Sequence, residues 1–109
     1  MVDTTELTAA VERFADRLRA APQSRLTRGA AAEGLALARE LAVRAQRLEE
    51  PGAEPRIMPD AGVFAVADQI VVASNDLAEI LRTAPPGPAA AELDEAVEAV
   101  RRAAARAAL

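Results

Sequence analysis

The chain has 109 residues, of which 51% are hydrophobic and 28% charged, and its 13 basic and 17 acidic residues give a formal net charge of −4. The apolar content excludes a disordered polyelectrolyte, and a chain of this length is expected to form a single core. The acidic balance argues against a nucleic-acid-binding protein, which needs a basic stripe to displace counterions from phosphates.

Composition also sets an expectation for location. The longest wholly apolar run, 61–67, is far shorter than the roughly 20 residues that span a bilayer. The N-terminal segment lacks the basic and apolar regions of a secretory signal. Every basic residue is an arginine and alanine is abundant, a usage typical of bacterial genomes rich in G and C. We therefore expect a cytoplasmic bacterial protein without membrane contact.

A first helix is predicted over 4–21. Asp3, Thr4 and Thr5 supply oxygens that can cap its start. Apolar residues then recur at spacings of four and three, the stripe of a helix that packs on a neighbour: Leu7, Val11, Phe14, Leu18 and Ala21. Pro22 ends the helix because proline removes a backbone donor and clashes with the preceding turn. The turn that follows is short, so the second helix is expected to return antiparallel to the first.

The second helix is predicted over 27–50, with Thr27 as its cap and Pro51 and Gly52 at its end. Small residues on its buried stripe permit another helix to approach closely. Gly29 and Gly34 each cost about 1 kcal/mol of helix propensity relative to alanine. The helix is therefore expected to start weakly.

The segment 51–59 is the only candidate linker, because no other stretch interrupts the helical period for as long. It has prolines at positions 51, 55 and 59. Its apolar Ile57 and Met58 predict that it folds back over one end of the core.

The third helix, predicted over 60–83 with Asp60 as its cap, is the most apolar segment of the chain. At 100° per residue its apolar residues cover about half of the circumference, which is wider than the stripe of a helix with one neighbour. Two or more helices must therefore pack on it, and it is expected to be central. Phe64 at its start is expected in the core, like Phe14 of the first helix.

A fourth helix is predicted over 88–108, because the prolines of 84–88 forbid a continuous helix through that stretch. Acidic residues crowd its first half and arginines its second, an order that suits the helix macrodipole. Together these elements predict an all-α fold. We expect a single domain, 1–109, that forms an antiparallel four-helix bundle built from two helical hairpins.

The side chains limit the possible chemistry. The chain has no His, Cys, Lys or Tyr, which removes most general bases and nucleophiles. Ser74 has no base to activate it and is expected to bond to the carbonyl of Ile70 instead. Carboxylates stand one turn apart in three places: Asp76 with Glu79, Glu92 with Glu95, and Asp94 with Glu98. The di-metal sites of helical bundles also use inward-facing histidines, so we expect no enzyme and no catalytic, cofactor or metal site.

An interaction protein remains, and the first hypothesis is a small module that binds a second copy as a homodimer, or another protein. The expected binding surface is the outward face of the third helix, an acidic strip with one apolar member: Asp68, Val72, Asn75, Asp76 and Glu79. Val43 is a second apolar residue on a polar face. The alternative hypothesis is a regulatory module that holds a small apolar ligand between alanine-rich helices. Many unrelated proteins share such a bundle, so the fold does not choose between them.

Overall fold

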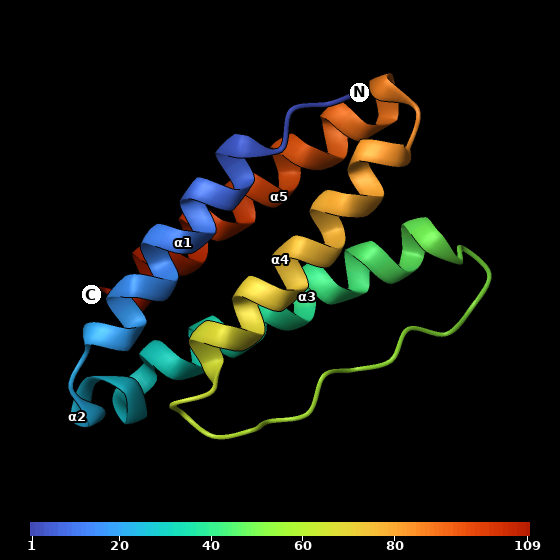
Figure 1. Ribbon diagram of the computed structural model, residues 1–109. Helices are drawn as coiled ribbons and strands as arrows, with labels where there is room; N and C mark the ends of the chain where they lie inside the picture. The colour runs from blue at the N-terminus through green and yellow to red at the C-terminus, as the bar shows by residue number, and fades with distance from the viewer.

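A computed structural model describes all 109 residues and contains helices only (Figure 1). The elements are α1 (Thr5–Ala20), α2 (Gln23–Arg25), a π-helical turn η1 (Leu26–Ala30), α3 (Ala31–Glu49), α4 (Val66–Thr83) and α5 (Pro86–Ala107). The predicted all-α fold with four long helices is therefore confirmed. None of these helices is both long and apolar enough to cross a membrane.

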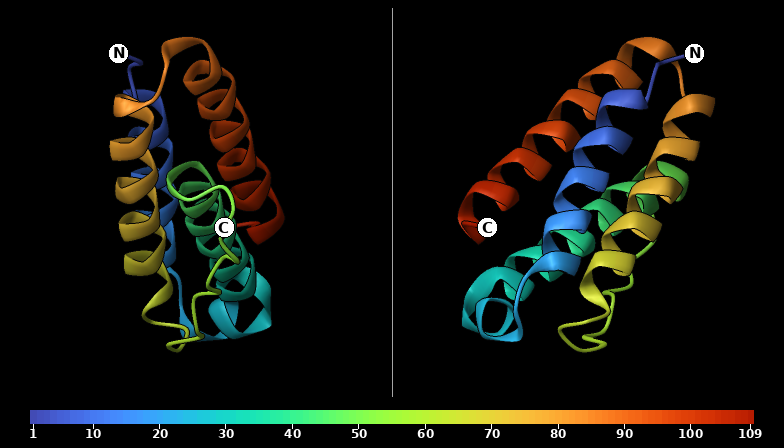
Figure 2. Two further views of the ribbon diagram at one scale, coloured as in Figure 1. Left: turned by 90° about the vertical axis from the view of Figure 1, so that its right-hand side faces the viewer. Right: turned by 60° about the vertical axis from the view of Figure 1, so that its left-hand side comes forward.

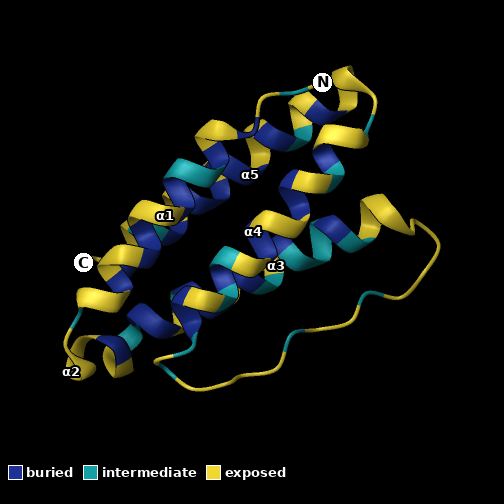
Figure 3. Ribbon diagram, viewed as in Figure 1, coloured by how far each residue is buried: buried dark blue, intermediate teal, exposed yellow.

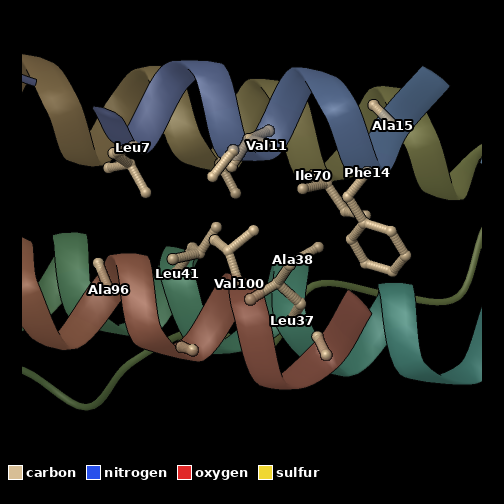
Figure 4. Close-up of a cluster of buried hydrophobic side chains, with 14 of the residues drawn as sticks. Leu7, Val11, Phe14, Ala15, Leu37, Ala38, Leu41, Ile70, Ala96 and Val100 are labelled. Atoms are coloured by element: carbon tan, nitrogen blue, oxygen red, sulfur yellow. The ribbon is translucent and has the colours of Figure 1, made fainter. Parts of the chain in front are cut away.

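Helix α4 is central, as its wide apolar arc predicts. The two most extensive helix contacts are those of α4 with α3 and of α4 with α1. Helix α5 packs on α1 and α3 from the other side, so α1 and α4 form one layer and α3 and α5 the other (Figures 2 and 4). The core fills the space between the layers, with Leu7, Phe14, Leu41, Ile70 and Leu77 among its fully buried side chains.

Of the long helices that are consecutive in the chain, only α3 and α4 pack extensively on each other. Helices α1 and α4 run antiparallel, since Arg19 reaches Asp68 at one end of the pair and Arg82 reaches Thr4 at the other. Helices α3 and α4 run parallel in the same direction (Figure 1). The consecutive pair α4 and α5 shares few contacts, and α1 and α3 share fewer still. The predicted packing of consecutive helices into two hairpins is not confirmed.

A parallel pair needs a connection that returns the chain to its starting end, and residues 50–65 provide it (Figure 1). Side chains of α3 hold this connection. Arg39 Nε donates to the Met58 carbonyl at 2.8 Å, while Gln46 Nε2 donates to the Arg56 carbonyl at 2.9 Å and Gln46 Oε1 accepts from the Arg56 amide at 2.8 Å. The connection therefore runs back along α3, and the expectation that it folds over one end of the core was wrong.

Helix α4 begins at Val66, six residues later than predicted from Asp60 as a cap. Asp60 Oδ1 accepts a hydrogen bond from the Gly62 amide at 2.8 Å, which closes a turn. Gly62 has a left-handed φ of 96°, a conformation that an α-helix excludes. The turn directs Phe64 outward, where it is 71% exposed, so its assignment to the core was wrong.

The second and fourth helices also start at residues other than those predicted, each for a local reason. The second helical stretch begins at Gln23, directly after Pro22, and the Thr27 hydroxyl donates to the Gln23 carbonyl instead of capping a start. The predicted weak start of the second helix corresponds to Gly29, whose backbone is non-helical inside η1. Helix α5 starts at Pro86 because proline is tolerated in the first turn, where the backbone N–H has no helical partner.

One buried polar group contradicts its sequence assignment. Ser74 on α4 is 1% exposed, as expected for its place on the apolar stripe. Its hydroxyl has no hydrogen-bond partner, so the predicted bond to the Ile70 carbonyl is absent. A buried hydroxyl without a partner costs free energy of folding.

Candidate interaction surface

The five residues of the predicted strip are all exposed on the outward face of α4: Asp68, Val72, Asn75, Asp76 and Glu79. We call this set the α4 strip. Exposed positions recur along α4 on the side away from the other helices (Figure 3). Val72, the apolar member, is 57% exposed. The helical period therefore placed these side chains on one accessible surface, with the valine between acidic residues.

The acidic members of the α4 strip differ in their partners. Asp68 Oδ1 lies 2.9 Å from Arg19 Nη2 of α1, and this hydrogen bond raises the pKa of Arg19 above its ordinary value. Asp76 and Glu79 form no ion pair. Two carboxylates on the C-terminal side of Val72 are thus free to accept hydrogen bonds from another molecule.

An open groove of about 550 Å³ lies beside these two carboxylates, between α3 and α4. Ala42, Ala45 and Ile80 supply its apolar lining, and Arg56 of the 50–65 connection is its only cationic residue. The α4 strip therefore borders a concave surface, which gives a protein partner more contact area than a lone helix face does.

Phe64 extends the surface in a way that sequence reasoning missed. It lies in the turn that precedes α4, four residues before Asp68, and is more exposed than Phe14, the other aromatic residue of the chain. The signal that could have located it is Asp60-Ala61-Gly62, because an aspartate two residues before a glycine favours a turn over a continuous helix. Phe64 and Val72, which precede and follow Asp68 by four residues each, therefore expose more apolar area at this end of α4 than the sequence predicted.

Val43, the other apolar residue expected on a polar face, is only half-buried and not free. It lines a groove between α3 and α5 beside Arg44. Arg44 contacts three carboxylates, with nitrogen–oxygen distances of 2.8 Å to Glu92, 3.1 Å to Glu40 and 3.7 Å to Glu95. Burial lowers the pKa of Arg44, but its hydrogen bonds to Glu92 and Glu40 outweigh burial and raise the pKa. The charge of Arg44 in this groove is therefore neutralised by carboxylates of the same chain.

The carboxylates do not gather into a metal centre: no group of three or more potential ligands lies close enough to hold a metal ion. Glu92 and Glu95, one of the pairs noted in the sequence, face Arg44 instead. Comparison of the chain with protein-family models, curated proteins and solved structures finds no match. The chemistry of its own surface is therefore the basis for a functional proposal.

Proposed function

We propose that this protein is a non-catalytic interaction module whose α4 strip binds a protein partner. The observation that carries the proposal is the exposed Val72, which the unpaired carboxylates Asp76 and Glu79 follow on the same face of α4. Charged outer faces are normal on helical bundles, and single exposed valines are too. This face differs because Phe64 adds a second large apolar side chain that no other part of the chain covers.

The chemistry of the strip specifies the partner. Unpaired carboxylates favour arginine, whose planar guanidinium donates two parallel hydrogen bonds to one carboxylate. Val72 and Phe64 supply apolar area that loses contact with water when it is covered. The partner is thus a protein surface with arginines around an apolar contact, and the charges accelerate the encounter.

The alternative, a small apolar ligand between the helices, lacks a supporting observation. Small residues on α3 allow a close approach of α4 instead of leaving a space. At Gly34, the side chain of Val66 occupies the volume that a ligand would need. A thermal-shift screen with apolar ligands tests this alternative, since a ligand present at 100 times its Kd adds about 2.7 kcal/mol of stability.

Affinity capture from a lysate of the source organism tests the proposal. Val72→Arg should lose the bound proteins, including second copies, that the parent protein captures, because a charge replaces the apolar contact. Ala32→Arg, at an exposed position of α3, is the matched control and should retain them. Both variants should keep the parent's helical signal and Tm. Identical capture by the parent, Val72→Arg and Ala32→Arg would contradict the proposal.

Charge reversal tests the role of the carboxylates separately. Asp76→Arg should weaken capture and reduce its sensitivity to salt, because one attractive contact becomes repulsive. Asp94→Arg makes the same charge change at an exposed, unpaired position of α5 and should have no effect. Equal weakening by both variants would mean that net charge, not the strip, controls binding.

A further inference from the structure

A second open groove, of about 420 Å³, lies between α1 and α5. Its accessible apolar lining comes from the end of α5 and the residues that follow it: Ala104, Ala105, Ala108 and Leu109. The contact between α1 and α5 is among the least extensive of the contacts between adjacent long helices. Because α5 is rich in alanine, its short side chains leave an open surface groove here, while Phe14 and Val100 beneath it are each only 1% exposed.

Three arginines surround this groove: Arg13, Arg17 and Arg101. Arg101 pairs with Glu6 at 2.7 Å, whereas Arg13 and Arg17 are exposed and form no ion pair. No aspartate or glutamate lines the groove. In the groove between α3 and α5, by contrast, three arginines are accompanied by three glutamates. The α1–α5 groove is therefore a basic site with an apolar floor, in a chain of net charge −4.

Arginines around an apolar floor are the chemistry that the α4 strip requires of a partner. We propose that the α4 strip of one copy docks into the α1–α5 groove of a second copy. Asp76 and Glu79 of the first copy then face Arg13 and Arg17 of the second, and Val72 covers the apolar floor. This inference rests on the proposed function of the α4 strip and adds the identity of the partner.

The two surfaces belong to different sides of the molecule, so the contact is head-to-tail. Helix α1 separates them, with α4 on one flank and the groove towards α5 on the other (Figure 2). A copy that uses its strip still has its groove free, and the assembly therefore grows with concentration or closes as a ring. A two-fold dimer through paired strips would instead place like charges opposite one another, which is unfavourable.

Sedimentation velocity on the full chain tests this contact. The parent protein, of 11.4 kDa, should show a mass that rises with concentration and falls at high salt. The strip variant Asp76→Arg/Glu79→Arg and the groove variant Arg13→Glu/Arg17→Glu should each associate about tenfold or more weakly, because like charges then meet. Mixing the two variants should restore association, since each reversed surface meets a complementary one. Arg28→Glu/Arg47→Glu reverses two exposed, unpaired arginines elsewhere and should match the parent.

Each other outcome overturns the inference in a distinguishable way. A parent that stays monomeric at every concentration excludes a second copy as the partner, while capture of another protein through Val72 would still support the proposed function. Loss of association in the strip variant alone means that the strip binds a different surface. Loss in both variants without recovery on mixing overturns the contact when the circular dichroism spectra and Tm values of both variants equal those of the parent.

Discussion

Gly34 of α3 lies so close to Val66 of α4 that a Cβ atom at position 34 would be 2.5 Å from Val66 Cγ1. Leu18 Cδ1 and Ile70 Cδ1 would be 3.2 and 3.3 Å away. Three helices therefore converge on this glycine. The parallel packing of α3 on α4 depends on the absence of a side chain at this point.

Gly34→Ala should destabilise the protein by about 1–3 kcal/mol, because the added methyl group overpacks a core that is already filled. Alanine gains about 1 kcal/mol of helix propensity, so the measured cost is the net of the two effects. Urea unfolding measures it. Gly52→Ala is the control, since a Cβ there meets no atom within 4 Å beyond its chain neighbours and its φ is not left-handed, and it should be neutral or stabilising. A Gly34→Ala variant as stable as the parent would show that α4 is packed less closely.

The two phenylalanines should respond to truncation in opposite ways. Phe14→Ala should cost about 3–5 kcal/mol, because Phe14 is 1% exposed and its removal leaves a cavity. Phe64→Ala should change stability by about 0.5 kcal/mol or less, as expected for a surface position. Thermal unfolding of the two variants side by side distinguishes them. A large loss on truncation of Phe64 would place it in the core, as the sequence pattern indicated.

Ser74→Ala should stabilise the protein by up to about 1 kcal/mol. The change removes a buried hydroxyl without a partner and improves helix propensity. Chemical denaturation reports the difference directly. If the variant were less stable than the parent, the hydroxyl would have a partner in solution.

Arg44→Leu should cost about 1–2 kcal/mol, because Glu92 would lose its nearest cation at a partly buried position. The pKa of Arg44 is raised on folding, so its contribution is fully present below the unfolded pKa and is lost only as pH rises through the folded pKa. The cost should therefore be constant between about pH 6 and 9. Arg102→Leu breaks a more exposed pair of 3.8 Å and should cost about 0.5 kcal/mol or less. Equal costs for the two variants would argue against a special role for Arg44.

The sequence predicted which segments are helical better than it predicted which helices pack side by side. Four periodic stripes bounded by prolines are local signals, so the long helices and the central position of α4 could be inferred. Which helices lie side by side depends on the 50–65 connection, whose contacts with Arg39 and Gln46 have no periodic signal. The chain therefore passes along α3, and α4 starts beside the start of α3.

The candidate surfaces also divide into features that follow from the helical period and features that depend on turns and packing. The exposure of the α4 strip follows from helical period alone, because residues such as Val72 and Asp76 lie on one helix. The exposure of Phe64 depends on the turn at Gly62, which keeps α4 from starting before Val66. The α1–α5 groove joins Arg13 and Arg101 from helices distant in sequence, and only the packing of the bundle brings them together.

Thiol labelling tests the central claim, that the outward face of α4 is a protein-binding surface. The chain has no cysteine, so Asn75→Cys places a single thiol in the α4 strip, and Ala32→Cys places one at an exposed control position on α3. Maleimide labelling rates are measured for dilute protein, for concentrated protein and in lysate of the source organism. We expect labelling of Asn75→Cys to slow several-fold in concentrated protein or lysate, while labelling of Ala32→Cys stays unchanged. Equal rates for the two thiols under all three conditions would contradict the claim.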